Sequence, residues 1–308
     1  MFHVKQPEKA SPKDSFGMDT PLARELADLS ARRRALETVS IDFAGDTRIL
    51  TVSNQKGGVG KTTSAVNVAS ALAGLGARVL VIDLDPQGNA STALGVPHNA
   101  ETPSVYDVLI EDTPLADIVQ QSPEDENLFC APSTIHLAGA EIEIVAQVAR
   151  EHRLRRALEE YLVDNRMDFV IIDCPPSLGL LTINAFTAAN EVFIPIQCEY
   201  YALEGLSQLL GSIQMIQKHL NPGLHLSTIL LTMFDGRTRL AQQVADEVRT
   251  HFPEQVLDTV IPRSVRVSEA PSFGQTVIAY DGQSAGAVAY REAAVEIASR
   301  TATQSKEK

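Results

Sequence analysis

The chain has 308 residues, of which 44% are hydrophobic and 21% charged, a composition typical of a globular protein with a sizeable core. No apolar run approaches the length of about 20 residues that a membrane-spanning helix needs, and no apolar signal-peptide core is visible, so we expect a cytoplasmic location. The formal net charge of −13 excludes a surface that is basic all over. Any binding to nucleic acid must therefore come from a local basic patch.

The cysteines and histidines predict no metal site. Cys130, Cys174 and Cys198 are widely spaced and form no C-x-x-C pair, and the seven histidines do not cluster at ligand spacing. We therefore expect reduced, mostly buried thiols rather than disulfides, and no transition metal held by protein ligands.

Residues 1–47 differ from the rest of the chain and are interpreted as an N-terminal extension. Residues 1–21 are polar and lack periodicity, which predicts disorder, whereas leucines at helical spacing predict a short helix over residues 21–37. The basic cluster Arg32, Arg33 and Arg34 is interpreted as a solvated face rather than a nucleic-acid contact.

From residue 48 onward, buried strands alternate with helices. A helix is predicted over residues 62–75, and the apolar strands are expected at residues 49–53, 78–82, 169–172, 192–196, 228–231 and 256–261. This alternation predicts an α/β fold over residues 48–301, a mainly parallel twisted sheet with helices on both faces. Residues 104–127 are acidic and are expected to form surface helices and turns, and residues 302–308 a frayed tail.

The strongest motif lies between the first predicted strand and the helix that follows it. Glycines allow the backbone to curl so that its N–H groups point toward phosphate oxygens at the positive end of a helix. Lys61 would reach the β- and γ-phosphates, and the Thr62 hydroxyl would ligate Mg²⁺. A purely structural glycine-rich turn is the alternative, but the strand–loop–helix context favours a P-loop NTPase. The motif consists of Lys56, Gly57, Gly58, Val59, Gly60, Lys61, Thr62 and Thr63.

Acidic residues follow two of the buried strands. Asp83 and Asp85 come after the strand at 78–82, and Asp173 ends the strand at 169–172, which is the Walker B arrangement. Carboxylates in such places need an electrostatic reason, and Mg²⁺ with an attacking water supplies one. Asp173 would hold Mg²⁺ through water, and Asp83 would support either Mg²⁺ or its own loop. For Asp83 or Asp85 alone, a helix cap or a turn is a reasonable interpretation, but it explains the whole run of residues 83–89 poorly.

The loop also departs from the usual G-x-x-x-x-G-K-[ST] pattern, because Gln55 occupies the position of the first glycine and Lys56 is an additional lysine. This form resembles the deviant Walker A motif of the ParA and MinD group of ATPases. The resemblance implies that Lys56 crosses the interface of an ATP-sandwich homodimer to reach the partner's nucleotide. It also implies that Asp85 orients or activates the attacking water, so that Lys56, Lys61 and Asp85 form the catalytic set.

Further stretches, at residues 197–205, 231–238 and 261–271, resemble the ParA (also called Soj) partition ATPases, over about residues 48–300. That resemblance implies slow ATP hydrolysis stimulated by a ParB-like partner, nonspecific binding to double-stranded DNA, a nucleoid-associated location and the segregation of chromosome or plasmid origins. Arg237 and Arg266, with Arg263 as a further candidate, match the family's DNA contacts. Pro262 and Ser264 lie where relatives contact the adenine. Without the resemblance, the three arginines would be interpreted as surface ion pairs.

The main alternative is a MinD-like ATPase that positions proteins or acts at membranes. Residues 287–308 lack the bulky apolar anchors of an amphipathic membrane helix, which argues against membrane binding. A nitrogenase-type iron protein would need cysteine ligands in a suitable arrangement, and a ligase or kinase would need a substrate-site signature; neither is visible. A nucleotide-gated binding module overlaps with the ParA interpretation, and the sequence does not distinguish a chromosomal from a plasmid replicon.

Overall fold

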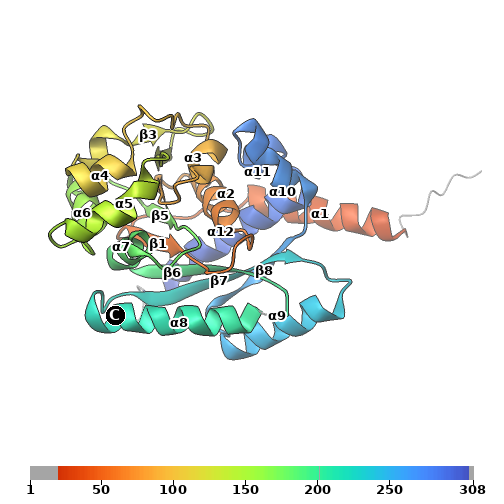
Figure 1. Cartoon of the computed structure of the whole chain (residues 1–308). Helices are drawn as coiled ribbons and strands as arrows, with labels where there is room; N and C mark the ends of the chain where they lie inside the picture. Colours follow the sequence, from red (N-terminus) through yellow and green to blue (C-terminus); the bar gives the residue numbers. More distant parts are fainter. Residues whose placement is uncertain (1–19, 201, 305–308) are drawn as a thin grey trace, which may run out of the picture.

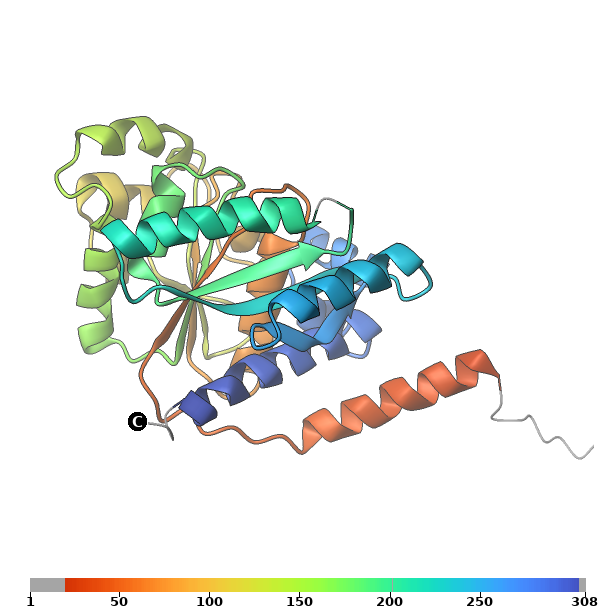
Figure 2. The same cartoon turned by 90° about the horizontal axis from the view of Figure 1, so that it is seen from below.

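The computed structural model describes residues 20–200 and 202–304, and within them a single eight-stranded sheet is covered by helices on both faces (Figures 1 and 2). The strands are β1 (Arg48–Val52), β2 (Val79–Asp83), β3 (Gln120–Gln121), β4 (Leu128–Ala131), β5 (Phe169–Asp173), β6 (Glu191–Gln197), β7 (His225–Phe234) and β8 (Val256–Pro262). The α-helices are α1 (Pro21–Glu37), α2 (Lys61–Ala73), α3 (Asn89–Ala93), α4 (Val105–Glu111), α5 (Leu137–Glu143), α6 (Arg153–Asp164), α7 (Leu180–Ala188), α8 (Ala202–His219), α9 (Arg239–His251), α10 (Val265–Glu269), α11 (Val277–Tyr280) and α12 (Ala285–Gln304). Short 3₁₀ turns are η1 (Leu115–Asp117), η2 (Ile144–Ala146) and η3 (Ala270–Phe273).

The strand order is β3-β4-β2-β5-β1-β6-β7-β8, and every neighbouring pair is parallel except the antiparallel pair β3–β4. The predicted α/β class with a mainly parallel sheet is therefore confirmed. The chain leaves β1 toward β2 on one side and leaves β6 toward β7 on the other, so the connections diverge beside β1. In open α/β sheets, ligands bind outside the carboxyl ends of the strands at such a switch point.

The alternation of side chains along β2 explains why both faces of the sheet are covered. Val79 and Val81 pack with α2 and α12, whereas Leu80 and Ile82 pack with α4 to α7 on the opposite face. Successive side chains of a strand point to opposite faces, so a continuous apolar run fits only a sheet buried on both sides. On the half of the sheet built by β6 and β7, the second face is covered by α8 and α9.

Three segments differ from the sequence-based expectation. The strands β3 and β4 were not predicted, because β3 consists of two polar residues inside the acidic stretch and β4 of only four residues just after it. Helix α4, expected at the surface, buries Val105, Val108 and Leu109 in the core beside β2 and β5. The three cysteines are buried and free, as predicted.

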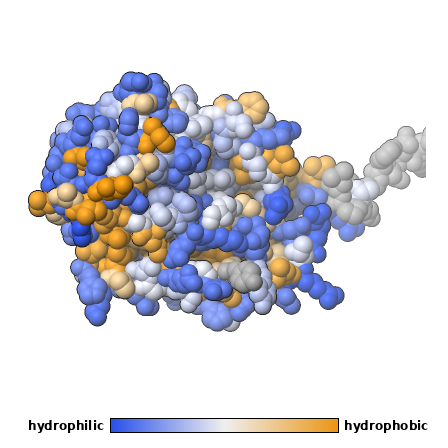
Figure 3. All heavy atoms as spheres, viewed as in Figure 1, coloured by the Kyte–Doolittle hydropathy of each residue, from blue (hydrophilic) through white to orange (hydrophobic). Residues whose placement is uncertain are grey.

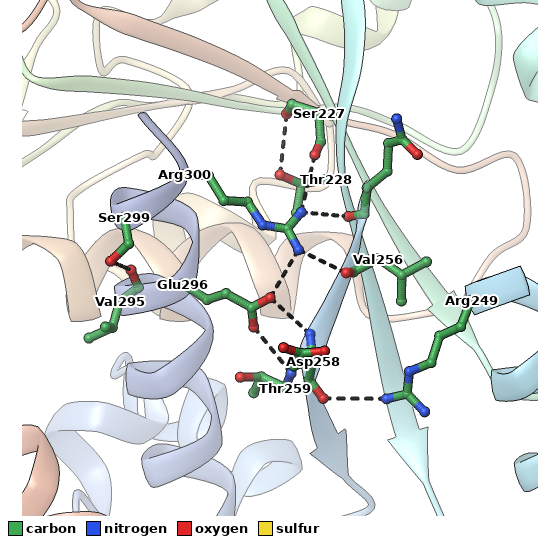
Figure 4. A network of polar contacts seen from close by, with 11 residues as sticks. Ser227, Thr228, Arg249, Val256, Asp258, Thr259, Val295, Glu296, Ser299 and Arg300 are labelled. Carbon is green, nitrogen blue, oxygen red and sulfur yellow. Dashed lines mark hydrogen bonds and ion pairs between the residues drawn. The ribbon is translucent and has the colours of Figure 1, made fainter. Parts of the chain in front are cut away.

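Helix α12 is fixed to the β7–β8 edge of the sheet by a polar network (Figure 4). The Arg300 guanidinium donates to the carbonyl oxygens of Gln255 and Val256 at 2.9 and 2.8 Å. Glu296 accepts the backbone N–H groups of Asp258 and Thr259 at 2.8 and 3.1 Å. The side chains of α12 thus add hydrogen bonds to backbone groups at and beside β8, which covers this edge of the sheet.

The predicted helix at residues 21–37 is present as α1, and it lies against α12 through an ion pair between Arg32 and Glu292 at 2.5 Å. Its first half extends beyond the rest of the molecule (Figure 2). Residues 38–47 run along the base of the sheet, where the rings of Phe43 and Phe169 meet edge to face at 5.9 Å. Residues 1–19 and 305–308, for which disorder and a frayed tail were expected, lie outside the described residues, and α12 continues through Gln304.

A buried ion pair joins the start of β1 to the start of β6. The Arg48 guanidinium forms two hydrogen bonds with Glu191, at 2.6 and 2.7 Å, and donates a third to the Ile297 carbonyl at 2.6 Å. Burial acts to raise the pKa of Glu191, but the hydrogen bonds and the charge of Arg48 outweigh it and the pKa is lowered. A carboxyl group whose pKa is lowered by folding stabilises the protein above its ordinary pKa, and this stability is lost as the pH falls through the lowered value.

We predict that Glu191→Ala lowers the free energy of unfolding by about 3–5 kcal/mol at pH 7, because it removes the carboxylate that neutralises the largely buried Arg48 charge. Urea unfolding curves measure this, and the deficit should narrow only at pH values below the usual glutamate range. Glu254→Ala, at an exposed position, is the control and should change stability by about 0.5 kcal/mol or less. Equal unfolding midpoints for the two variants would contradict the prediction.

Candidate active site

The loop between β1 and α2 is curled by two glycines with left-handed backbone conformations. Gly58 has φ +74° and Gly60, the residue that caps α2, has φ +89°. L-residues with a side chain rarely adopt this conformation, so these positions require glycine. All the residues of the predicted motif, from Lys56 to Thr63, lie in this loop or in the first turn of α2, where backbone N–H groups and the helix dipole favour an anion.

Neighbouring strands hold the loop in place. The Asn54 side chain donates to the Pro195 carbonyl of β6 at 2.8 Å and accepts the Lys56 N–H at 3.0 Å. From β7, the Thr232 hydroxyl donates to the Val59 carbonyl at 2.8 Å. Asn54 and Thr232 were not predicted as site residues, because nothing in a single sequence shows which strands become neighbours of β1.

Lys61 is buried at the start of α2, and its ammonium group points back toward the loop, 3.4 Å from the Lys56 carbonyl. Burial lowers the pKa of Lys61, while the charges of Asp173 and Asp85 act in the opposite direction. A buried cation inside a ring of N–H donors is suited to an anionic ligand such as a phosphate group.

Asp83 and Asp173 end adjacent strands and lie opposite each other in the register of β2 and β5. The Asp83 carboxylate accepts three hydrogen bonds, from the Ser91 N–H and hydroxyl at 2.8 and 2.7 Å and from the Asp85 N–H at 3.1 Å. Burial raises the pKa of Asp83 to about 6, and these hydrogen bonds limit the rise. Of the two roles expected for Asp83, the geometry favours the support of its own loop and of α3, and a contact with Mg²⁺ stays a prediction.

Asp173 is fully buried, and neither of its carboxylate oxygens has a hydrogen-bond partner among the described residues. Burial, reinforced by the charge of Asp83, raises the pKa of Asp173 well above its usual value, and the nearby Thr62 hydroxyl acts in the opposite direction. A buried carboxylate that lacks a partner is unfavourable unless a cation joins it.

These residues fit a magnesium ion. Mg²⁺ prefers oxygen ligands and usually keeps several waters, being held by one or two protein groups together with substrate phosphates. Asp173 and the Thr62 hydroxyl supply such groups beside the phosphate loop. Within the part of the chain that the structure describes, no group of three or more His, Cys, Asp or Glu side chains is placed to hold a metal ion.

Asp85 lies just beyond β2 and is half-buried, and its carboxylate accepts the Gln87 N–H at 3.0 Å. The following Gly88, with φ +64°, turns the chain into α3. Asp85 therefore shares the carboxyl edge of the sheet with Lys61 and Asp173, where the resemblance places the residue that orients water.

Lys56 points toward the loop after β6. Its ammonium group lies 2.6 Å from a carboxylate oxygen of Glu199, and the two side chains are 40% and 47% exposed. The amide of Gln197 donates to the other oxygen of Glu199 at 2.5 Å. In the single subunit, the lysine expected to cross a dimer interface is thus paired within its own chain. Exposed ion pairs contribute about 0–1 kcal/mol, so this one can be exchanged for another anion.

The other predicted residues lie at the ends of β7 and β8. Pro262 pairs with Phe234 at the end of β8, and Ser264 caps α10. Arg263 is exposed, and its N–H donates to the Phe234 carbonyl at 3.3 Å. The structure therefore brings the expected adenine contacts to the same edge of the sheet as the phosphate loop.

The two arginines that match the family's DNA contacts both have acidic neighbours. Arg237, 90% exposed, forms two hydrogen bonds of 2.8 Å with Asp235. This pairing lowers the pKa of Asp235 to about 2. Arg266 lies 3.2 Å from Glu269 and 3.4 Å from Asp281. The surface ion pairs that composition alone favours are present, and DNA binding by these side chains stays a prediction.

Exposed apolar side chains gather beside the same edge, on the left of the molecule in Figure 3. Ile142 and Val148, on α5 and just after η2, are 79% and 87% exposed. Ile135 precedes α5, and Leu178 follows Asp173 in the next loop; both are exposed too. Apolar surface of this kind typically marks a protein–protein contact.

Comparison with known proteins identifies the family. A family profile described as an AAA domain matches residues 47–226. The sporulation initiation inhibitor protein Soj of Bacillus subtilis is 54% identical over 251 residues, which are 82% of this chain and 98% of that protein. The chromosome partitioning protein ParA of Caulobacter vibrioides is 49% identical over 83% of this chain and 96% of its own length. The chain belongs to the ParA/Soj family of chromosome-partitioning ATPases.

A solved structure resembles this ParA/Soj family member over 80% of its chain, with a TM-score of 0.69 and 40% identity, covering 93% of the other chain. It is named as a cobyrinic acid a,c-diamide synthase from Mycobacterium smegmatis, with a bound ATP analog and magnesium. That name describes a different activity, whereas the two relatives of higher identity are named for partitioning and for sporulation control. The structural match shows the shared fold.

For this ParA/Soj family member we predict that Asp173→Asn raises the melting temperature of the nucleotide-free protein, because it removes a buried charge that has no hydrogen-bond partner. The same variant should lose the stabilisation by ATP with Mg²⁺, which for wild type is about 2.7 kcal/mol at a ligand concentration 100 times Kd. Thermal unfolding with and without ATP and Mg²⁺ measures both effects. An Asp173→Asn protein that is less stable than wild type when nucleotide-free, yet still stabilised by ATP with Mg²⁺, would contradict the assignment.

Proposed function

We propose that this protein is an ATP-driven DNA-partitioning switch, in which nucleotide binding joins two copies into a dimer that binds duplex DNA without sequence preference. The observation that carries the proposal is the convergence of four features at one edge of the sheet. They are the curled phosphate loop, the buried Lys61, the unpartnered Asp173 and the deviant lysine Lys56. Membership of the ParA/Soj family supports it.

Nucleotide binding uses the loop amides and the start of α2. The N–H groups of residues 57–63 and the Lys61 ammonium bind the phosphates, and Thr62 and Asp173 hold Mg²⁺. When bound, Mg²⁺ neutralises charge on the β- and γ-phosphate oxygens. Pro262 and Ser264 contact the adenine from the end of β8.

Hydrolysis needs a water molecule in line with the γ-phosphate. Asp85 orients or activates that water, because it lies two residues beyond the end of β2, near Lys61, and its carboxylate is only half-buried, so that water can reach it. Three hydrogen bonds to Asp83 fix the loop that carries Asp85. Loss of the γ-phosphate then removes the contacts that hold the active dimer.

Dimerisation places Lys56 of each subunit on the nucleotide of the other. The exchange is feasible because the pair with Glu199 is exposed and therefore weak. The exposed apolar side chains Ile135, Ile142, Val148 and Leu178 adjoin the same edge and would be covered by the second copy.

DNA binding uses Arg237, Arg263 and Arg266, presented twice by the dimer. Arginine suits phosphate because its planar, permanently charged fork can form two parallel hydrogen bonds. In a chain of net charge −13, such a patch must be local, and binding must weaken strongly with salt. The proposal also includes a nucleoid-associated location and a ParB-like, centromere-binding partner that stimulates ATP hydrolysis. The cargo is then chromosome or plasmid origins.

A MinD-like role at a membrane has less support. No helix within the described ranges has both the length and the apolar composition to span a bilayer. Helix α12, at the C-terminal end, is fixed to β7 and β8 by Arg300 and Glu296 (Figure 4), so it is not available as a free amphipathic anchor.

We predict that Asp85→Ala retains ATP binding and traps the ATP-bound dimer, because the γ-phosphate is no longer lost. Size-exclusion chromatography with light scattering should show a dimer that persists with ATP, and phosphate release should fall at least about a hundredfold, the lower end of the range for loss of a general base. Lys61→Ala, which should abolish nucleotide binding, is the control for nucleotide-independent dimers. Normal turnover in Asp85→Ala would refute the role assigned to this residue.

The proposed function is tested by the binding of random-sequence duplex DNA with ATP, with ADP and without nucleotide, at about 50 and 200 mM salt in each case. Binding should require ATP and fall steeply with salt, and Arg266→Glu should reduce the slope of log K against log salt by about 0.9 for each phosphate group that the variant no longer neutralises. Arg155→Glu is a matched control, because Arg155 forms an exposed helical ion pair with Glu159 on α6. If no condition produces DNA binding, the ATPase assignment stands but partition yields to a membrane- or protein-directed role.

A further inference from the structure

Glu124 joins three segments that are distant in the sequence. It lies in the turn between β3 and β4, and its carboxylate reaches both α2 and the start of α11. One oxygen accepts the Thr276 N–H at 2.6 Å, and the other accepts the Thr276 hydroxyl at 2.8 Å and the Ser70 hydroxyl at 3.2 Å. Ser70 belongs to α2, the helix that begins at the phosphate loop, and both donor residues are buried.

The contacts of Glu124 specify the relative position of α2 and α11, in addition to holding the two helices together. Burial raises the pKa of Glu124, and the hydrogen bonds from Thr276 and Ser70 act in the opposite direction. Buried charged groups are weak evidence for stability, because apolar residues of similar volume often stabilise a protein equally well. A carboxylate that is satisfied only when α2 and α11 both present their donors instead specifies one relative position of the two helices.

A second set of hydrogen bonds also links α2 to α11, and it begins at the phosphate loop. The buried Asn67 side chain donates to the Thr63 carbonyl at 2.7 Å and accepts the Val277 N–H at 2.7 Å. Thr63 is the last residue of the predicted phosphate motif. A change in the backbone at the start of α2 therefore reaches α11 through a single side chain.

The end of α3 contacts the same junction. Gly95, with φ +66°, has no room for a side chain, since a Cβ there would lie 3.0 Å from Pro123 and 3.1 Å from the Gly274 carbonyl. Pro123 precedes Glu124, and Gly274 follows η3. Helix α3 begins four residues after Asp85, so the segment that follows Asp85 and the turn that carries Glu124 meet beside η3.

On its outer side, the segment held by Glu124 carries Arg266. Helix α10 runs directly into η3 and α11, and the rings of Phe273 and Tyr280 stack at 4.9 Å across the turn. Arg266 then pairs with Asp281 at 3.4 Å, just past α11. Residues 265–281 thus form one closed unit, with Glu124 and Asn67 on its inner side and Arg266 on its surface.

We propose that Glu124 is a positioning residue that couples the nucleotide-bearing helix α2 to residues 265–281, so that the nucleotide state sets the placement of Arg266 for DNA. The inference rests on the proposed function in taking Arg266 as a DNA contact. The mechanical link between α2 and α11 stands on the contacts of Glu124 and Asn67 alone. In this proposal Glu124 contacts neither ATP nor DNA. Its effect is on how strongly the affinity for DNA depends on the bound nucleotide.

The experiment compares the full-length variants Glu124→Ala and Glu126→Ala, which remove the same charge from the same turn; Glu126 is exposed. Affinity for random-sequence duplex DNA is measured with ATP and with ADP, alongside the affinity for ATP itself. Glu124→Ala should keep ATP affinity within about twofold of the control and lose about tenfold of the ATP-over-ADP preference for DNA, within the usual range of coupling factors of about 5 to 150. An unchanged preference would overturn the proposal.

Hydrogen exchange at the amides of Thr276 and Val277 separates this inference from the proposed function. In wild type, ATP should slow exchange at these amides relative to ADP, and Glu124→Ala should abolish that difference even if wild type proves not to bind DNA. No ATP-dependent protection in wild type, or equal protection in both proteins, would overturn the coupling. If Glu124→Ala fails to fold, Glu124→Gln replaces it, because glutamine keeps the shape of the side chain and loses its charge. An ATP-dependent difference in hydrogen exchange equal to that of Glu126→Gln would then count against the proposal.

Discussion

Two carboxylates buried side by side at the end of a parallel sheet are the constraint on which the rest of the site depends. The register of β2 and β5 places Asp83 opposite Asp173, so each charge disfavours the other. The fold provides hydrogen-bond donors for only one of the two carboxylates. Asp83 is satisfied by Ser91 and by the backbone of its own loop, and Asp173 is left for a cation. Lys61 lies close enough for its charge to act on Asp173, which prepares this edge of the sheet for a phosphate–metal complex.

The phosphate loop takes its shape from its glycines and its position from other strands. Asn54 ties it to β6, and Thr232 of β7 holds the Val59 carbonyl. Glu199, also beyond β6, holds Lys56 in the single subunit. A change at the phosphate loop would therefore act on β6 and β7, on one side of β1, whereas Asp83 and Asp85 lie on the other side. This geometry suits a switch that dimerises when nucleotide binds. Lys56, which would bridge the two subunits, forms only a weak ion pair with Glu199, and a phosphate group could replace that carboxylate.

Charge balance explains how so acidic a chain could still bind DNA. Arg237 and Arg266, at the ends of β7 and β8, each form an ion pair with an acidic neighbour, so part of their charge is neutralised in the isolated subunit. Each of these pairs is solvent-exposed and contributes about 0–1 kcal/mol, which phosphate contacts can replace. Two subunits side by side would double the number of arginines along one surface, and counterion release from DNA rises with each contact. Binding that depends on assembly is a natural outcome of this arrangement.

Local patterns in the sequence determined the α/β class, six of the eight strands and the phosphate-binding loop. An apolar run predicts a buried strand, and glycines followed by a lysine and two threonines predict the phosphate loop. Both patterns act through burial and backbone conformation alone, without contacts from distant residues. The motif order also indicated Asp83, Asp85 and Asp173 together. Only the tertiary structure decided that Asp83 accepts hydrogen bonds from Ser91 while Asp173 has no hydrogen-bond partner among the described residues, that Lys56 pairs with Glu199, and that the short strands β3 and β4 complete the sheet. Those outcomes depend on which strands become neighbours and in what register, a property of contacts between residues far apart in the chain. For the same reason nothing in the sequence around Glu124 indicated that it would meet Ser70 and Thr276.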